Sequence, residues 1–343
     1  MKPCKAAEKR CQKKPDPQYG GIAAWGKERA RGQMMKISPE EFARALGLSV
    51  ISATGRQKER SIGVADLCRP GLQFSGYFDV FAYERPQVIG KTEMAYLTSL
   101  SEDVLVRRLD QYFSYDIPCI IIARGMECPQ SLLRHAQRSG VPVYGTQEET
   151  SAFSATAMVY LSEAFAPKQT CHGVLLDVYG VGVMITGESG VGKSECALEL
   201  VKHGHQLVAD DVVDISRVGK VLWGEAPEMV RDFMELRGVG IVDIKEIFGI
   251  GAVVRRMKVD LVIHMEFWTE GKEYDRLGTM DKTMDVLGVR IPLLELPVRP
   301  GRSLATIVEI AARNWRLRAE GYNAADELDR RLAMHYRQAD EAK

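Results

Sequence analysis

Apolar residues recur along the chain in two spacings, and polar turns separate the segments. Alternating or unbroken apolar runs predict short strands, whereas apolar residues three or four positions apart predict helices. From residue 36 to about residue 164, predicted strands and predicted helices alternate, which favours an open α/β sheet. The predicted strands here are residues 49–53, 88–90, 117–123 and 141–144; one predicted helix begins at Pro39, and two others span 102–109 and 129–139.

A second series of elements follows a predicted linker at residues 165–170. Residues 171–179 predict a strand that turns at Gly180 onto a second apolar strand, residues 181–186. Helical spacing resumes at 194–201, a glycine at 204 ends that helix, and a further apolar strand runs to residue 209. Near the end, Ser303 is placed to cap a helix that continues to residue 317 and turns its apolar face to a core or a subunit contact.

We therefore divide the chain into three parts. Residues 1–34 are rich in lysine and arginine, have few regularly spaced apolar residues, and are expected to form a disordered extension. Residues 35–164 are expected to form an N-terminal α/β domain, and residues 165–335 a second, C-terminal domain. We also expect translation to begin at Met34 or Met35, a hypothesis that an intact mass including residues 1–33 would reject.

Composition excludes several classes of partner. Lysine and arginine number 46, as do aspartate and glutamate, so no bulk charge favours nucleic acid or a membrane surface. No apolar run reaches the length of a membrane span, and the basic N-terminus lacks the apolar core of a signal peptide. The seven cysteines are scattered without a C-x-x-C pair, so we expect reduced thiols and a cytoplasmic protein.

The most informative motif is GESGVGKS, which matches the phosphate-binding pattern G-x-x-x-x-G-K-[ST]. A predicted strand leads into it and a predicted helix leads out, as the motif requires. Its lysine would reach the β- and γ-phosphates of a nucleoside triphosphate, and its serine hydroxyl would ligate Mg²⁺. The predicted nucleotide-binding residues are Gly187, Glu188, Ser189, Gly190, Val191, Gly192, Lys193 and Ser194.

Three further residues lie close to this motif in the predicted fold. Asp210 and Asp211 end the strand after the loop helix, where phosphate-transfer enzymes hold a metal or position a nucleophile. Successive side chains of an extended chain point opposite ways, so one carboxylate can face the metal and the other an incoming hydroxyl. The alternative is an aspartate-rich turn between strands. His172 lies at the start of the predicted strand that neighbours the strand leading into the loop. A single histidine at such a position is more often a surface or hydrogen-bonded residue than a catalytic one.

Several glycine- and arginine-containing loops are less specific. Residues 235–243 predict a turn before a strand, and residues 274–278 and 297–302 place arginines on short loops suited to phosphate. Most arginines on exposed loops contact only water. Without further evidence, we therefore assign no function to these segments.

Taken in order, these segments resemble the HPr kinase/phosphorylase family of bacterial carbon-catabolite control. The resemblance covers the chain from about Met35 onward. It rests on residues 69–79 and 87–93 of the first domain, and on GESGVGKS, the aspartate pair and the run from Glu235 to Asp243 in the second. The family implies two domains, an N-terminal α/β domain and a C-terminal P-loop kinase domain with a core like that of phosphoenolpyruvate carboxykinase.

The resemblance also implies roles for individual residues. His172, Lys193, Asp211 and Arg276 would be catalytic, with Asp211 as the base in phosphorylation and the acid in the reverse reaction. Ser194 and Glu235 would hold Mg²⁺, and ATP would be the phosphoryl donor. The run 297–302 is similar to a loop tied to dephosphorylation, so the residues expected to support the site are Asp210, Arg237, Arg299 and Arg302.

The implied protein substrate is HPr, phosphorylated on a regulatory serine, and family members are homohexamers. Two features depart from the family pattern: Glu188 stands where aspartate is usual, and the basic extension has no counterpart. Two other readings stay open. One is a small-molecule kinase or carboxykinase-like enzyme on the same core; the other is a nucleotide sensor without transfer, which the Asp210–Asp211 pair disfavours.

Overall fold

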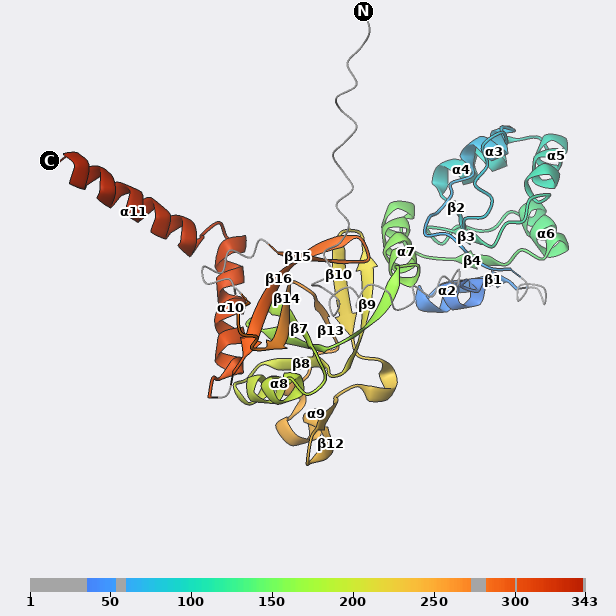
Figure 1. Cartoon of the computed structure of the whole chain (residues 1–343). Helices are drawn as coiled ribbons and strands as arrows, with labels where there is room; N and C mark the ends of the chain where they lie inside the picture. Colours follow the sequence, from blue (N-terminus) through green and yellow to red (C-terminus); the bar gives the residue numbers. More distant parts are fainter. Residues whose placement is uncertain (1–35, 54–59, 273–281, 300, 342–343) are drawn as a thin grey trace, which may run out of the picture. The chain divides into compact units, whose positions relative to one another are not determined.

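The computed structural model of the chain describes residues 36–53, 60–272, 282–299 and 301–341. Its residues form two compact units that divide between Ala166 and Pro167, the N-terminal unit and the C-terminal unit (Figure 1). The predicted basic extension lies outside the described residues. Within the described ranges, no helix is both long and apolar enough to cross a membrane.

The N-terminal unit is a four-stranded sheet with the order β1-β4-β3-β2, in which β2, β3 and β4 are parallel and β1 is antiparallel to β4. Its strands are β1 (Ser49–Ser52), β2 (Gln87–Ile89), β3 (Ile120–Ile122) and β4 (Val143–Gly145). Its helices are α2 (Pro39–Ala45), α3 (Gly71–Ser75), α4 (Lys91–Ser99), α5 (Glu102–Tyr112), α6 (Gln130–Ser139) and α7 (Thr150–Ala164). This is the α/β architecture that the alternation of elements predicted.

Side-chain alternation along these short strands divides the core of the unit into two layers. Ile120 and Val143 pack into the cluster that contains residues of α3, α4, α5 and α6. Ile121 and Tyr144, each the next residue along its strand, belong to the cluster that contains residues of α2 and α7. Successive residues of a strand face opposite sides of the sheet, so even a strand of three residues contributes side chains to both layers.

Local signals placed the elements of this unit well. Ser38 caps α2 in a capping box, with Pro39 at the first helical position, as the sequence predicted. Gly140 ends α6 in the left-handed conformation that favours glycine. The predicted strands and the helix at 102–109 are all present, with ends displaced by a few residues. These predictions are confirmed. They could be made from the sequence because turns and caps depend on residues only a few positions apart.

The C-terminal unit contains a six-stranded mixed sheet with the order β15-β16-β14-β7-β6-β8. Strands β16, β14 and β7 are parallel, whereas β6 and β15 run antiparallel to their neighbours. The strands of this sheet are β6 (Val174–Val178), β7 (Val181–Gly187), β8 (Gln206–Ala209), β14 (Leu261–Phe267), β15 (Thr283–Val286) and β16 (Val289–Val298).

A second, antiparallel sheet of this unit has the order β13-β10-β9-β5, and a separate hairpin pairs β11 with β12. These strands are β5 (Lys168–His172), β9 (Val212–Val218), β10 (Val221–Glu225), β11 (Phe233–Leu236), β12 (Gly240–Asp243) and β13 (Arg256–Lys258). The helical elements are α8 (Lys193–Lys202), η3 (Glu228–Val230), α9 (Ile244–Phe248), η4 (Ile250–Ala252), α10 (Leu304–Ala319) and α11 (Ala324–Glu341).

Strand β7 lies at the centre of this unit, buried on both faces. Its residues Val183 and Ile185 pack with Leu200 of α8 and Val308 of α10. The residue between them, Met184, packs instead with residues of β9 and β10 in the second sheet. A strand covered on both sides reads as an unbroken apolar run, which is how the sequence predicted it.

Three local predictions need correction. The predicted strand 171–179 is two strands, because the chain bends at Gly173 (φ 154°), where a Cβ would collide with the carbonyl oxygen of Ile185. His172 therefore ends β5 in the second sheet. Residues 168–170 of the predicted linker belong to the same strand, and residues 235–243 form both strands of the β11–β12 hairpin rather than a loop alone. Helix α11 was not predicted, although α10 and its Ser303 cap were.

Candidate active site

The phosphate-loop motif lies between β7 and α8, as predicted. Two of its glycines meet backbone demands that no other residue meets without strain: Gly192 (φ 99°) caps α8, and a Cβ on Gly187 (φ 143°) would collide with the carbonyl oxygen of Met265. The ammonium of Lys193 donates to the carbonyl oxygens of Gly187 and Glu188, each at 2.9 Å. The loop therefore has the backbone conformation of an anion-binding loop, with a lysine held at its end.

Ser194 and Asp210 form the contact that joins the loop to the end of β8. The Ser194 hydroxyl donates to Asp210 Oδ1 at 3.0 Å and lies 3.3 Å from Oδ2, and the backbone N–H of Glu235 donates to Oδ2 at 3.2 Å. Asp210 is buried. Burial raises the pKa of its carboxyl, and the hydrogen bonds from Ser194 and Glu235 oppose that rise.

The neighbouring carboxylate has the opposite environment. Asp211 has a left-handed backbone (φ 64°), and its side chain is 74% exposed. Its Oδ1 lies 3.8 Å from Nδ1 of His172, and its carbonyl oxygen accepts from the N–H of Gly173 at 3.0 Å. The turn thus separates the two aspartates: Asp210 contacts the loop serine, whereas Asp211 faces solvent beside an imidazole.

Ser194, Asp210 and Asp211 line a cavity of about 140 Å³, whereas His172 is not among its lining residues. Arg237, at the turn of the β11–β12 hairpin, donates to Ser189 Oγ at 3.3 Å and so connects the hairpin with the phosphate loop. The lining residues are Val174, Ser189, Gly190, Gly192, Lys193, Ser194, Glu195, Asp210, Asp211, Glu235 and Arg237. Three segments distant in sequence from the phosphate loop therefore converge on it. The sequence did not single out Val174 and Glu195; only Glu195 had a signal, its place directly after Ser194.

Arg299 and Arg302, predicted to support the site, do not line this cavity. Arg276 lies outside the described residues. The guanidinium of Arg299 lies over the Trp268 ring, 3.2 Å from its centroid, and Arg302 is exposed just before α10. The contact of Trp268 with Arg299 had no sequence signal, because Trp268 directly follows β14 and is far from Arg299 in the sequence.

The donor atoms around Ser194 suit a hard divalent cation. A hydroxyl and the carboxylates of Asp210 and Glu235 offer only oxygen, the ligand type that Mg²⁺ prefers. Among the described residues, no cluster of three or more histidine, cysteine or acidic side chains is arranged to hold a metal by itself. Mg²⁺ in phosphoryl-transfer enzymes takes one or two carboxylates and completes its shell with phosphate and water, so this partial set fits it.

Comparisons with known proteins agree with this arrangement of motifs. Residues 37–161 match the family model described as HPr Serine kinase N terminus, and residues 163–332 match the HPr Serine kinase C-terminal domain. The HPr kinase/phosphorylase of Thermoanaerobacter sp. (strain X514) is 48% identical over 300 residues, which cover 87% of this chain and 98% of that protein.

Two further matches come from other organisms. The HPr kinase/phosphorylase of Caldanaerobacter subterraneus subsp. tengcongensis is 47% identical over 300 residues, with 87% of this chain and 98% of that protein covered. A solved structure of the Hpr(Ser) kinase/phosphatase from Coxiella burnetii is 37% identical, with a TM-score of 0.43, and covers 47% of this chain and 98% of that one. Since both family models match and full-length relatives are nearly half identical, the chain belongs to the HPr kinase/phosphorylase family.

Proposed function

We propose that this protein is a bifunctional enzyme that phosphorylates a regulatory serine of HPr and removes that phosphate by phosphorolysis, in bacterial carbon-catabolite control. ATP or pyrophosphate is the phosphoryl donor, and Mg²⁺ is the metal. The observation that carries the proposal is the position of Asp211. Its carboxylate is exposed and lines the same cavity as the phosphate loop, where a hydroxyl of another protein can reach it.

In the forward direction, the serine Oγ of HPr bonds to the γ-phosphorus while the bond from that phosphorus to the bridging oxygen of ADP breaks. The serine proton passes to a carboxylate oxygen of Asp211. A carboxylate is a weak base toward an alcohol, so Asp211 contributes chiefly by holding the hydroxyl in line with the departing oxygen. Lys193, with Arg276 assigned by resemblance, offsets the charge on the transferred group.

Ser194, Asp210 and Glu235 are the residues that would hold Mg²⁺. When bound, the ion supplies positive charge toward the β- and γ-phosphates. We assign His172, 3.8 Å from Asp211, to hydrogen bonding with the transferred phosphoryl group. Arg237 supports the loop through Ser189.

In the reverse direction, an oxygen of inorganic phosphate bonds to the phosphorus of phosphoserine while the bond to the serine Oγ breaks. Protonated Asp211 returns its proton to that departing oxygen, and pyrophosphate is released. The same carboxylate serves both directions because the two reactions share one transition-state geometry. We assign Arg299 and Arg302 to this reverse reaction.

We further propose that the enzyme is a cytoplasmic homohexamer. Family resemblance supports the hexamer. No disulfide joins the cysteines that the structure describes, which supports a reducing compartment; they are Cys68, Cys119, Cys128, Cys171 and Cys196.

The experiment that tests the proposal is transfer of label from γ-labelled ATP to purified HPr, run beside an HPr in which the regulatory serine is alanine. We expect label on the unmodified HPr alone, and release of pyrophosphate when phosphate is then added. Absence of label on both proteins, with Mg²⁺ present, would overturn the proposal. ATP consumption in a panel of metabolites would then identify the small-molecule kinase.

A further inference from the structure

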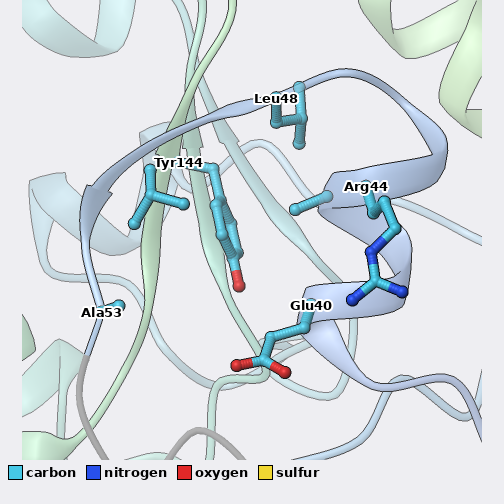
Figure 2. A pocket seen from close by; sticks show the side chains of 7 residues that line it. Glu40, Arg44, Leu48, Ala53 and Tyr144 are labelled. Atoms are coloured by element: carbon cyan, nitrogen blue, oxygen red, sulfur yellow. The ribbon is translucent and has the colours of Figure 1, made fainter.

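The N-terminal unit contains a cavity of about 350 Å³ between α2 and the β1–β4 edge of the sheet. Figure 2 shows the Tyr144 ring lying between the strand that leads to Ala53 and the helix that carries Glu40 and Arg44. The lining residues are Glu40, Ala43, Arg44, Leu48, Val50, Ala53 and Tyr144. A cavity of this size falls within the range that binds small organic molecules.

The hydroxyl of Tyr144 is the first indication that the cavity takes a polar ligand. The side chain is 1% exposed, and its hydroxyl oxygen has no hydrogen-bond partner in the part of the chain that the structure describes. Figure 2 shows this oxygen pointing to the end of the cavity where the Glu40 carboxylate lies. Buried hydroxyls are nearly always paired, so an unpaired one facing a cavity indicates a missing hydrogen-bond partner.

Burial, with a smaller contribution from the charge of Glu40, raises the pKa of the Tyr144 hydroxyl above its usual value. The group therefore stays protonated and can donate a hydrogen bond. Tyr112 also has a buried, unpaired hydroxyl, but it packs among Phe74, Phe81 and Phe113 and is not among the residues that line this cavity. The two tyrosines are thus a natural pair of test and control positions.

The rest of the lining has a polar side and an apolar side. Glu40 and Arg44 lie one helical turn apart on α2, which places a carboxylate and an exposed guanidinium at the same rim. Across from the helix, Leu48 and Val50 supply apolar surface, and Val50 is 62% exposed. A matching ligand has an anionic group, a hydrogen-bonding group that can donate, and a short apolar skeleton.

We propose that this cavity binds a small amino or hydroxy carboxylic acid. Its carboxylate pairs with the guanidinium of Arg44, and its amino or hydroxyl group lies between the Glu40 carboxylate and the Tyr144 hydroxyl. Its aliphatic carbons pack on Leu48 and Val50. All the lining residues of the cavity belong to the N-terminal unit.

Calorimetric titration of the full-length protein tests the site with four probes: L-valine, L-leucine and their 2-hydroxy analogues. Isovalerate, which lacks the amino or hydroxyl group, and isobutylamine, which lacks the carboxylate, are the ligand controls. We expect at least one probe to bind with a Kd below about 1 mM and at least about tenfold more tightly than either control.

Two variant pairs locate the binding. We expect Tyr144→Phe to weaken the probe about fivefold or more without lowering Tm, because the hydroxyl makes no hydrogen bond to the described residues. We expect Arg44→Gln to weaken it about tenfold or more. The matched controls, Tyr112→Phe and Arg107→Gln on the exposed face of α5, should leave the Kd unchanged.

Two results would overturn the proposal. One is failure of all four probes to bind at about 10 mM. The other is binding that is equally strong in Tyr144→Phe and Arg44→Gln. Arg44 is exposed, so its replacement tests the site even where a change at Tyr144 disturbs the core.

Discussion

The imidazole Nδ1 of His172 lies 3.8 Å from Oδ1 of Asp211, although one residue ends β5 and the other follows β8. The pairing of β5 with β9 brings them together, because it sets His172 opposite Val212, the residue after Asp211. The N–H of Gly173 then bonds to the Asp211 carbonyl oxygen and holds the two segments in register. Backbone pairing thus positions the carboxylate that we propose as the base beside its imidazole neighbour.

Replacing Asp211 with asparagine should lower phosphate transfer to HPr by about 10²–10⁴-fold, because the carboxylate that orients the serine hydroxyl and accepts its proton is lost. Nucleotide affinity should stay nearly unchanged, since the Ser194–Asp210 contact is separate. Asparagine tolerates the left-handed backbone at this position. Transfer rates from labelled ATP and calorimetric nucleotide binding measure the two effects.

Asp232→Asn is the matched control, since Asp232 is also left-handed (φ 68°) and does not line the cavity. Equal loss of transfer and nucleotide binding in Asp211→Asn would instead indicate a structural or metal-holding role.

Replacing Ser194 with alanine should weaken Mg²⁺-dependent nucleotide binding by about 10- to 100-fold, because the hydroxyl that contacts Asp210 is removed. Titration of nucleotide at several Mg²⁺ concentrations measures the change. Ser194→Thr is the control, because threonine keeps a hydroxyl at this position and also satisfies the motif. If nucleotide affinity depends on Mg²⁺ concentration equally in Ser194→Ala and the unmodified protein, Ser194 is not a ligand of the metal.

Replacing Arg299 with alanine should lower phosphorolysis at least about tenfold more than it lowers the kinase rate, and Arg302→Ala should do the same. Both rates are measured on one preparation, with HPr and phosphoseryl-HPr as substrates. The control is Arg313→Ala, which removes a similar contact outside the cavity, because the Arg313 guanidinium lies over the Tyr179 ring. This variant should not change the ratio of the two rates. Equal losses in both directions would argue against a separate role for the residues before α10.

Replacing Glu93 with glutamine should destabilise the protein by about 1–3 kcal/mol at pH 7, because a buried carboxylate that accepts from Arg69 and from the Gly90 N–H is lost. Burial alone would raise the pKa of Glu93, but the hydrogen bonds outweigh it and lower the pKa from 4.5. A lowered folded-state pKa means that this stabilisation is complete above about pH 4.5 and is lost as the pH falls below that value.

Urea unfolding of the full chain at a series of pH values should therefore show the difference between Glu93→Gln and the unmodified protein shrinking toward acid. Glu41 forms the same kind of capping box at α2 but is exposed, so Glu41→Gln should have a much smaller effect. A difference that is independent of pH would mean that the Glu93 charge contributes nothing to stability.

The sequence by itself determined what depends on near neighbours. The phosphate loop, its flanking strand and helix, the Ser38 and Ser303 caps and the glycine helix ends all follow from residues within a few positions of one another. The motif order was also specific enough to identify the family. Hydrogen bonding and sterics within a turn decide such features, and these act before any tertiary contact forms.

Only the tertiary structure decided which distant segments meet. The split at Gly173 depends on contact with Ile185, and the approach of Arg237 to Ser189 depends on where the β11–β12 hairpin packs. The different environments of Asp210 and Asp211 arise from one left-handed residue, and the Tyr144 cavity from how α2 lies on the sheet. Sheet register and helix packing sum many weak contacts between remote residues, so no local pattern in the chain specifies them.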